Sequence, residues 1–314
     1  MQESKKVLIT GGAGFIGANL VREFRANSPE VELRVLDDLS TGYRENLDGQ
    51  GVDFYLGSVA DPEAIQEAAD GVDSIVHLGA LGSVPRSVDD PVTTHIANLE
   101  GTLQVLEAAR RNNSHVIFSS SSSVYGSNKS LPKTENDWTR PLSPYAVSKL
   151  GAEAYLLAYQ SSYGLPTLPF RFFNVYGPLQ SAGHAYAAVI PKFLDRIRAG
   201  EPILIEGDGE QSRDFTSVKT VTAVLRDAVE RRVTHDSPVN LAYGSFTTVN
   251  QLADKIQNHL GRPVEREHVA PRVGDVRASS ADGVLIRQLF PTIDPTPLDE
   301  GLPETVDWYM QRPV

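Results

Sequence analysis

The first half of the chain alternates short β-branched apolar runs with longer stretches whose apolar residues recur at helical spacing. This alternation is typical of parallel strands joined by crossover helices. It predicts strands at Val7–Thr10, Glu32–Leu36, Asp53–Leu56, Ser74–Leu78, His115–Ser119 and Thr167–Phe172. The helices between them are predicted at Phe15–Asn27, Asp61–Asp70, Val92–Asn112 and Pro144–Tyr163. The expected fold class is therefore α/β, with a doubly wound parallel sheet.

Beyond Asn174 the alternation becomes less regular and predicts a smaller C-terminal α/β region. The expected elements there are helices at Ala188–Ala199, Lys219–Arg231 and Val249–Leu260 and a strand at Ile203–Glu206. Pro238–Tyr243 has the composition of one more buried strand, which returns the chain to the first sheet. We therefore expect a Rossmann domain from residues 1–174 and about 215–246. A second domain is expected from residues 175–214 and about 247–314.

Composition narrows the possible classes of protein. The 314 residues include 40% hydrophobic and 22% charged residues, which excludes a disordered or fibrous chain. No apolar run is long enough to span a bilayer, and the polar start leaves no room for a signal peptide, so we expect a cytoplasmic protein. The net charge of −11 opposes binding to nucleic acid or anionic membranes. The absence of cysteine excludes disulfides, thiolate metal sites and a cysteine nucleophile, and we expect no metal.

A glycine-rich turn follows the first predicted strand and opens the first predicted helix. Gly11 suits the tight turn, Gly14 lets the backbone approach a pyrophosphate, and Gly17 lets helix and strand pack closely. About twenty residues later, Asp37 and Asp38 end the second strand, where a carboxylate accepts the hydroxyl groups of an adenosine ribose. A 2′-phosphate would meet two carboxylates there. The sequence therefore predicts NAD as the cofactor.

A tyrosine and a lysine four residues apart occur twice. Tyr145 and Lys149 lie on a predicted helix, with Pro144 in its first turn, so both side chains project from one face. Tyr125 and Lys129 are separated by turn-forming residues, and their side chains need not meet. The helical pair is therefore the candidate catalytic pair.

Tyr145 suits a base for a sugar or alcohol hydroxyl group only if its pKa is lowered. Lowering a tyrosine pKa by about 3 units requires about 4 kcal/mol. One positive charge at roughly 5 Å and an effective dielectric constant of about 20 supplies about 3 kcal/mol. Lys149 is expected to provide most of this effect and the positive nicotinamide the remainder. A serine of the Ser119–Ser123 run can stabilise the developing alkoxide.

With these motifs together, the chain resembles the extended short-chain dehydrogenase/reductases and, among them, the NAD-dependent nucleotide-sugar 4-epimerases. The resemblance extends from Lys6 to about Asp282. The motifs that carry it are Gly11-Gly12-Ala13-Gly14-Phe15-Ile16-Gly17, Asp37-Asp38-Leu39-Ser40-Thr41-Gly42, Ser119–Ser123 with Val124-Tyr125-Gly126, Tyr145 to Lys149, and Arg171-Phe172-Phe173-Asn174-Val175-Tyr176-Gly177.

The resemblance implies a set of site residues. The implied catalytic residues are Ser121, the base Tyr145 and its partner Lys149. The implied NAD-binding residues are Gly11, Gly14, Phe15, Ile16, Gly17, Asp37, Asp38, Ser58, Val59, Tyr145 and Lys149. The implied contacts to a UDP-sugar are Ser121, Ser123, Tyr145, Asn174, Ala188, Val189, Arg213, Arg272 and Asp275. Two arginines fit a diphosphate, and an aspartate fits ribose hydroxyl groups.

The chain departs from the family pattern at two positions. The family usually has an aspartate after the glycine at Gly57 to contact adenine, whereas this chain has Ser58. That contact is then left to Asp61 or to the main chain. Many members also carry a lysine or glutamine after the fourth strand, where this chain has Leu81 and Gly82.

The expected activity is 4-epimerisation of a UDP-sugar through a 4-keto intermediate. The sugar is expected to be UDP-GlcNAc/UDP-GalNAc, because the stretch from Ala185 to Phe193 resembles that of UDP-N-acetylhexosamine epimerases, or UDP-glucose/UDP-galactose. UDP-glucuronate epimerisation and other sugar-nucleotide dehydratase or reductase activities are the alternatives. Related dehydratases carry an Asp-Glu pair, and decarboxylases a Glu, where this chain has Ser122 and Ser123. A non-catalytic dinucleotide-binding protein is a third possibility, although such relatives typically lose the Tyr or the Lys.

A homodimer is also expected. The predicted helices Val92–Asn112 and Pro144–Tyr163 carry apolar and aromatic residues on more than one face. These residues are Leu99, Leu103, Leu106, Tyr155 and Tyr159. The resemblance implies a bundle of four such helices between two subunits.

Overall fold

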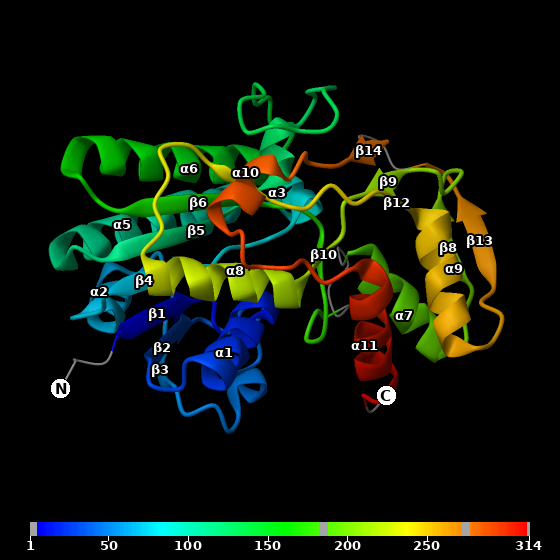
Figure 1. Cartoon of the computed structure of the whole chain (residues 1–314), viewed down its shortest axis with the longest axis horizontal. Helices are drawn as coiled ribbons and strands as arrows, with labels where there is room; N and C mark the ends of the chain where they lie inside the picture. Colours follow the sequence, from blue (N-terminus) through cyan, green and yellow to red (C-terminus); the bar gives the residue numbers. More distant parts are fainter. Residues whose placement is uncertain (1–4, 182–187, 272–276, 313–314) are drawn as a thin grey trace. The chain divides into compact units, whose positions relative to one another are not determined.

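The computed structural model of the protein describes residues 5–181, 188–271 and 277–312 (Figure 1). The chain divides into two compact units. Unit 1 contains residues 1–128, 135–172 and 222–240, and unit 2 contains residues 129–134, 173–221 and 241–314. Each unit is thus assembled from separate stretches of the chain.

Unit 1 is built on a seven-stranded sheet with the order β11-β6-β5-β4-β1-β2-β3. Strands β1 to β6 pair in parallel, which confirms the predicted doubly wound α/β class. The strands are β1 Lys6–Thr10, β2 Glu32–Asp37, β3 Asp53–Leu56, β4 Ser74–His77, β5 His115–Ser121, β6 Thr167–Phe172 and β11 Val239–Leu241. The strand order reverses between β1 and β4, and in such sheets ligands bind beyond the carboxyl ends of the strands at this point.

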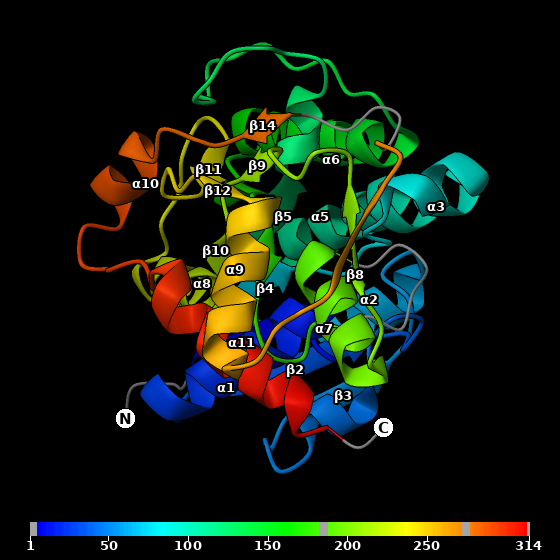
Figure 2. The same cartoon turned by 90° about the vertical axis from the view of Figure 1, so that its right-hand side faces the viewer.

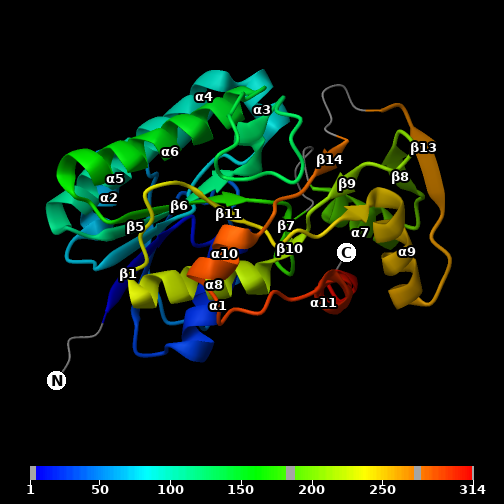
Figure 3. The same cartoon turned by 45° about the horizontal axis from the view of Figure 1, so that its top comes forward.

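Helices cover both faces of this sheet (Figures 1 and 3). The helices α2 Pro62–Ala69, α5 Gly101–Asn112 and α6 Pro144–Tyr163 pack their buried residues against one face. The helices α1 Phe15–Asn27 and α8 Val218–Arg231 lie along the other. Two short 3₁₀ turns, η1 Arg44–Leu47 and η3 Ser122–Tyr125, follow β2 and β5.

The helix predicted over Val92–Asn112 is present but contains a π-helical turn. It runs through α4 Pro91–His95, the π-helical turn η2 Ile96–Glu100 and α5, and a short helix α3 Val84–Asp89 precedes it. The hydroxyl group of Thr102 donates to the carbonyl oxygen of Asn98 at 2.5 Å, inside the irregular turn. Side-chain hydrogen bonds of this kind compete with the regular helical ladder. The helix therefore changes its winding at Asn98.

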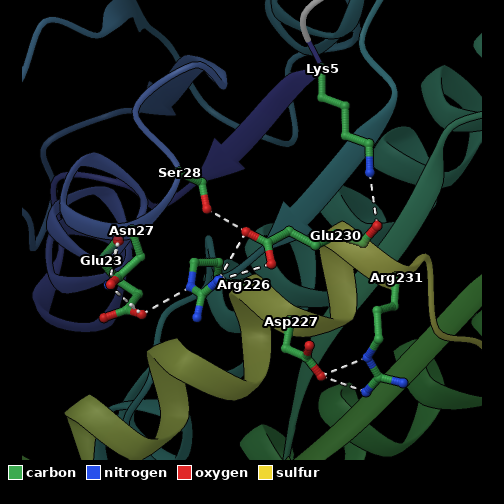
Figure 4. A network of polar contacts seen from close by, with 8 residues as sticks. All are labelled: Lys5, Glu23, Asn27, Ser28, Arg226, Asp227, Glu230 and Arg231. Carbon is green, nitrogen blue, oxygen red and sulfur yellow. Dashed lines mark hydrogen bonds and ion pairs between the residues drawn. The ribbon is translucent and has the colours of Figure 1, made fainter.

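A network of charged and polar side chains fastens α8 to α1 (Figure 4). Arg226 forms ion pairs with Glu23 at 3.0 Å and with Glu230 at 2.9 Å. The Ser28 hydroxyl group also donates to Glu230, and Lys5 Nζ donates to the carbonyl oxygen of Glu230 at 2.8 Å. The C-terminal half of α8 is thus held within unit 1.

Unit 2 consists of small sheets and three main helices. The helices α7 Val189–Ala199, α9 Val249–Leu260 and α11 Leu298–Met310 enclose an apolar core together with β8 (Figure 2). The strands are β7 Val175–Tyr176, β8 Ile203–Glu206, β9 Ser212–Arg213, β10 Thr216–Ser217, β12 Thr247–Thr248, β13 Arg266–Val269 and β14 Ala278–Ser279, and a short helix α10 spans Val284–Leu289. Among the described residues, no helix combines the length and the apolar composition needed to cross a membrane.

Two histidines are buried in unit 1 and should make the protein sensitive to acid. Burial, with a smaller effect of the Lys149 charge, lowers the pKa of His77 to about 3. Burial lowers the pKa of His115 to about 4, although its hydrogen bond to the Val233 carbonyl opposes the shift. Below a pH of about 6.5 the unfolded chain binds protons that the folded protein does not, so stability falls with falling pH.

We expect the free energy of unfolding to decrease by about 2 kcal/mol per histidine between pH 7 and pH 5. Urea unfolding at the two pH values measures this difference. The difference should shrink by about half in His115→Asn, whatever that variant does to stability at pH 7. An unchanged difference in the variant would contradict the assignment.

Candidate active site

The glycine turn after β1 is shaped by close backbone contacts. Gly11 has a positive φ of 69°, and a Cβ atom there would lie 2.7 Å from the Gly79 nitrogen. A Cβ at Gly14 would instead have only the Gly11 carbonyl oxygen nearby, at 3.2 Å. Gly14 also provides no side-chain cap for α1, whose first turn contains no acidic residue. The free amide groups of Phe15, Ile16 and Gly17 therefore suit an anionic pyrophosphate.

Asp37 fastens the end of β2 to this turn. Its carboxylate accepts hydrogen bonds from the amide groups of Ala13 at 2.9 Å and Leu39 at 2.8 Å. Burial raises the pKa of Asp37, while these backbone hydrogen bonds oppose the shift. Each carboxylate oxygen keeps a second lone pair for a ribose hydroxyl group. The Asp38 carboxylate accepts from the Ser40 amide at 2.9 Å.

The surroundings of Asp37 favour a ribose without a 2′-phosphate. Arg44, the nearest following arginine, places its guanidinium carbon 4.4 Å from the centroid of the Phe54 ring. The side chain is thus stacked on an aromatic ring, and the carboxylates of Asp37 and Asp38 dominate the local charge. The residues present therefore fit NAD.

The segment after β3 gives adenine few side-chain partners. The Ser58 hydroxyl oxygen accepts from the Ala60 amide at 3.2 Å. Asp61, which the sequence offered as a substitute contact, is the N-cap of α2 and accepts from Glu63 and Ala64 amide groups. Val59 is buried and lies beside Gly79.

Three serine and tyrosine hydroxyl groups form a chain at the end of β5. The Ser123 hydroxyl donates to Ser121 Oγ at 2.9 Å, and the Ser123 amide donates to the same oxygen at 3.2 Å. The Ser121 side chain acts on the nearby Tyr145 phenol as a hydrogen-bond donor and lowers its pKa. Because Ser121 Oγ already accepts two hydrogen bonds, its own proton remains available for donation. This arrangement can present a hydroxyl donor and a phenol to one substrate oxygen.

Helix α6 positions Tyr145 and Lys149 as the sequence predicts. Ser143 caps the helix by accepting from the Ala146 amide at 3.2 Å, and Pro144 occupies the first turn. Lys149 is buried, donates from Nζ to the Ser119 carbonyl at 2.8 Å and lies 4.9 Å from the Phe118 ring centroid.

The electrostatics of Tyr145 differ from the expectation that Lys149 lowers its pKa. Burial raises the pKa of Tyr145, and the hydrogen bond with Ser121 lowers it only in part. Burial also lowers the pKa of Lys149 to about 7, so this side chain is only partly charged at neutral pH. Its ammonium group is engaged by Ser119. The protein's own groups therefore leave Tyr145 as a phenol at neutral pH, and a base at this position requires an additional positive charge.

Tyr125 belongs to a different, buried network. Its hydroxyl group donates to Asn240 Oδ1 at 2.7 Å and accepts from Arg171 Nη1 at 2.9 Å. Arg171 forms an ion pair with Glu153 at 2.6 Å, and the Ser120 hydroxyl donates to Glu153 at 2.8 Å. The ion pair of Arg171 and Glu153 thus holds β5, the strand that carries Ser121, through the Ser120 hydroxyl group. The sequence analysis missed this role of Glu153, which stands one helical turn after Lys149.

Apart from Ser121, Ser123 and Tyr145 in unit 1, the residues that the resemblance assigns to the UDP-sugar belong to unit 2. The Asn174 side chain donates to the Asp214 carbonyl at 3.2 Å, next to Arg213 on β9. The Asp214 carboxylate accepts from amide groups of Gly244 and Ser245, both at 3.0 Å. Asn174 and Arg213 are therefore held together by Asp214, which the sequence analysis did not single out.

Of the remaining substrate residues that the resemblance assigns, Ala188 and Val189 lie between Asn174 and Arg213 in the sequence. Ala188 is exposed at the N-cap of α7, and Val189 is the first residue of that helix. Arg272 and Asp275 lie outside the described residues. No cluster of three or more histidine, aspartate or glutamate side chains suited to a metal ion occurs within residues 5–181, 188–271 and 277–312.

Comparisons with known proteins identify relatives over nearly the whole chain. Residues 7–242 match the model of the NAD dependent epimerase/dehydratase family. The UDP-glucose 4-epimerase of Mycolicibacterium smegmatis is 33% identical, over 98% of this chain and 99% of that protein. A solved structure of UDP-N-acetylglucosamine 4-epimerase from Methanobrevibacter ruminantium, in complex with UDP-N-acetylmuramic acid, is 36% identical, covers 98% and 99% of the two chains and gives a TM-score of 0.91.

A structure with the cofactor is also similar. The UDP-glucose 4-epimerase of Thermus thermophilus in complex with NAD is 33% identical, covers 98% and 99% of the two chains and gives a TM-score of 0.87. These comparisons confirm the resemblance on which the sequence analysis relied. The chain therefore belongs to the NAD dependent epimerase/dehydratase family.

Proposed function

We propose that the protein is an NAD-dependent 4-epimerase of a UDP-sugar, with UDP-GlcNAc/UDP-GalNAc or UDP-glucose/UDP-galactose as the substrate pair. The observation that carries this proposal is the chain of hydroxyl groups from Ser123 through Ser121 to Tyr145, with Lys149 one helical turn away. In this proposal unit 1 binds NAD and unit 2 binds the UDP-sugar, with Asn174 and Arg213 among the contacts. A cytoplasmic location is consistent with the cysteine-free sequence.

Tyr145, Ser121 and Lys149 have separate roles in the proposed reaction. Tyr145 takes the proton of the sugar O4 hydroxyl group, and Ser121 donates a hydrogen bond to the oxygen as negative charge develops. NAD, held by the glycine turn and Asp37, would supply reversible hydride transfer at the sugar C4, which allows the 4-keto sugar to be reduced from its opposite face. Lys149 orients the cofactor, whose oxidised nicotinamide would supply the positive charge that Tyr145 needs to act as a base. After the sugar turns over, Tyr145 returns its proton, so no net oxidation occurs.

The serine-rich segment favours epimerisation over elimination. Ser122 and Ser123 stand where the related dehydratases and decarboxylases carry carboxylates. A 4,6-dehydratase needs an acid and a base at the sugar C5 and C6, and a serine hydroxyl group is a weak substitute for either. Epimerisation needs only the O4 proton transfer and the hydride transfer.

An assay with candidate substrates tests the proposal. The purified protein is incubated with UDP-GlcNAc, UDP-glucose or UDP-glucuronate, and the products are identified by NMR of the anomeric region. We expect a 4-epimer from one of the first two, with no accumulation of NADH. A 4-keto-6-deoxy product would indicate a dehydratase, and binding without turnover would indicate a non-catalytic protein.

The cofactor is expected to remain bound and to be NAD. Denaturing the purified protein and separating the released dinucleotides identifies it. Asp37→Asn should weaken NAD binding by about 10- to 100-fold, because a charged hydrogen-bond acceptor is lost beside the ribose. Calorimetric titration of the cofactor-free protein measures this change. Recovery of mainly NADP would contradict the assignment of Asp37.

We also propose a homodimer formed through the α3, α4 and α6 helices. Tyr155 is 40% exposed, but Leu106 and Tyr159 are buried in the core, and Leu99 and Leu103 are partly buried and pack against it, which corrects that part of the prediction. The exposed apolar and aromatic residues of these helices and of η2 are Val84, Val88, Val92, Ile96, Val147, Tyr155 and Tyr163. Apolar side chains gathered on adjoining helices are typical of a subunit interface.

Light scattering tests this proposal. We expect a mass about twice the 34.2 kDa of the chain at micromolar concentration. Val88→Asp with Val92→Asp should shift the mass to that of a monomer, because two charges would be buried without partners. A monomeric mass for the unmodified protein would refute the dimer.

A further inference from the structure

A continuous line of buried hydrogen bonds in unit 1 begins at the residue before the glycine turn. Thr10 Oγ1 lies 2.7 Å from Nδ1 of His77, which ends β4. The same oxygen accepts from the Gly79 amide at 3.2 Å. Thr10 and His77 are both buried, and Gly79 packs against Gly11. The carboxyl ends of β1 and β4 are therefore tied together through Thr10.

The line continues from the other side of the imidazole to the catalytic helix. His77 Nε2 lies 3.0 Å from Thr102 Oγ1, and Thr102 donates to the Asn98 carbonyl in η2. Asn98 Nδ2 donates to Ser148 Oγ at 3.1 Å, and Ser148 donates to the Tyr145 carbonyl at 2.8 Å. We call Thr10, His77, Thr102, Asn98 and Ser148 the buried polar line.

Asn98 also secures the loop after β4. Its Oδ1 accepts from the Leu81 amide at 2.8 Å, and its Nδ2 donates to the Leu81 carbonyl at 3.3 Å. The π-helical turn that carries Asn98 is thus fixed both to this loop and to α6. A displacement of the turn would be passed to Ser148, which stands between Tyr145 and Lys149.

The directions of the hydrogen bonds determine the form of the imidazole. The single hydroxyl proton of Thr102 is used toward Asn98, so Thr102 must accept from His77 Nε2–H. Nδ1 of the neutral ring is then an acceptor and receives the proton of Thr10, which itself accepts from Gly79. Every donor and acceptor of the ring is satisfied in this form. Burial, which lowers the pKa of His77 to about 3, keeps the ring neutral.

We propose that His77, as the neutral Nε2–H tautomer, is a positioning residue that fixes the catalytic helix α6 relative to the glycine turn. This inference rests on the proposed function, because it assigns the two ends of the line to the cofactor and to the base. The Nδ1 contact with Thr10 holds the turn that receives the pyrophosphate. The Nε2 contact with Thr102 holds the π-helical turn and, through Asn98 and Ser148, the backbone of Tyr145. His77 is buried and acts through these contacts alone in this proposal.

The tautomer is tested first, without any assay of activity. Selective ¹⁵N labelling of histidine and a long-range ¹H–¹⁵N NMR spectrum at pH 7 distinguish the two neutral tautomers and the charged ring. We expect the His77 signals, assigned by their loss in a His77 variant, to show a protonated Nε2 and an unprotonated Nδ1. The opposite tautomer or a charged ring would overturn the inference.

Two substitutions at His77 separate the contacts. In His77→Asn, the side-chain amide lies where Nδ1 was and can accept from Thr10. In His77→Gln, the longer side chain places its amide where Nε2 was and can donate to Thr102. His77→Gln should weaken NAD binding roughly tenfold, the loss of one hydrogen bond at the turn. His77→Asn should keep NAD binding and lower kcat by about 10- to 100-fold at unchanged KM, since the base shifts by a fraction of an ångström.

Two threonine variants distinguish an effect of the buried polar line on catalysis from a general loss of stability. Thr102→Val removes the hydroxyl group that accepts from His77 and should reproduce the kcat effect of His77→Asn. Thr167→Val removes an equally buried hydroxyl group, which contacts Gln160 at 3.1 Å outside the line, and should change neither kcat nor NAD binding. Equal effects of the two valine variants on folded protein would show that His77 acts only on stability and would overturn the inference.

The outcomes also separate this inference from the proposed function. If the unmodified protein converts no UDP-sugar, the proposed epimerase function fails. The tautomer and the NAD affinity of His77→Gln then still test the positioning role, because both are measured without turnover. If the protein is an active epimerase and both His77 variants retain normal kcat and NAD binding, the positioning role alone fails.

Discussion

Replacement of Tyr145 by Phe is expected to reduce kcat by about 10³-fold or more, since a positioned proton acceptor is removed from the reacting oxygen. Binding of NAD and of the UDP-sugar should persist because the ring and its packing remain. Ser121→Ala should cost less, on the order of 10² to 10³, the effect of losing one hydrogen-bond donor to a developing oxyanion. Steady-state kinetics and calorimetric titration of both ligands measure these effects.

Tyr125→Phe is the matched control for Tyr145→Phe. Its hydroxyl group bonds to Asn240 and Arg171 in the buried network, so we expect reduced stability and nearly unchanged proton transfer. If Tyr145→Phe turned over at a near-normal rate, or if Tyr125→Phe lost more activity, the base would have been assigned to the wrong tyrosine.

The second large effect is expected at the ion pair between Arg171 and Glu153. Both side chains are at most 5% exposed, and two guanidinium nitrogens of Arg171 donate to the carboxylate, at 2.6 and 3.0 Å. Glu153→Ala would leave a buried guanidinium group without its counter-charge. We expect the free energy of unfolding to fall by about 3 to 5 kcal/mol. Urea unfolding followed by circular dichroism measures the loss.

Asp227→Asn provides the matched control for this prediction. Asp227 also pairs with an arginine, Arg231, but the arginine side chain is 46% exposed (Figure 4). Loss of such an exposed pair should cost no more than about 1 kcal/mol. Similar losses in Glu153→Ala and Asp227→Asn would mean that burial does not govern the strength of these pairs in this protein.

The features that follow a local pattern were predictable from the sequence. Strands β1 to β6 are short apolar runs, and the glycine turn is defined by the backbone space that Gly11 and Gly17 require. Helix α6 was predicted from Pro144 to Tyr163 because its cap, its first-turn proline and its helical pattern are all local. The pair of Tyr145 and Lys149 follows from the helical period alone.

Features that depend on distant partners were not predictable in the same way. The interruption at η2 depends on Asn98, whose side chain contacts Leu81 and Ser148, residues far along the chain in both directions. The ion pair of Glu153 with Arg171 joins a helix to a strand, and no periodicity relates the two residues. Leu106 and Tyr159 were misjudged because an amphipathic pattern does not distinguish a core face from a subunit interface.

The position of β11 has a consequence for synthesis of the protein on the ribosome. β11 borders β6 in the sheet, yet it is made almost 70 residues later, after the chain has passed through residues 173–221 of unit 2. Until Asn240 emerges, β6 is an edge strand with unpaired backbone groups, and the Tyr125 hydroxyl group lacks its Asn240 acceptor. A nascent chain that stalls within this interval exposes a strand edge that can pair with another chain. Slow translation there would therefore favour pairing at this strand edge, whereas β11 covers the edge once it has been made.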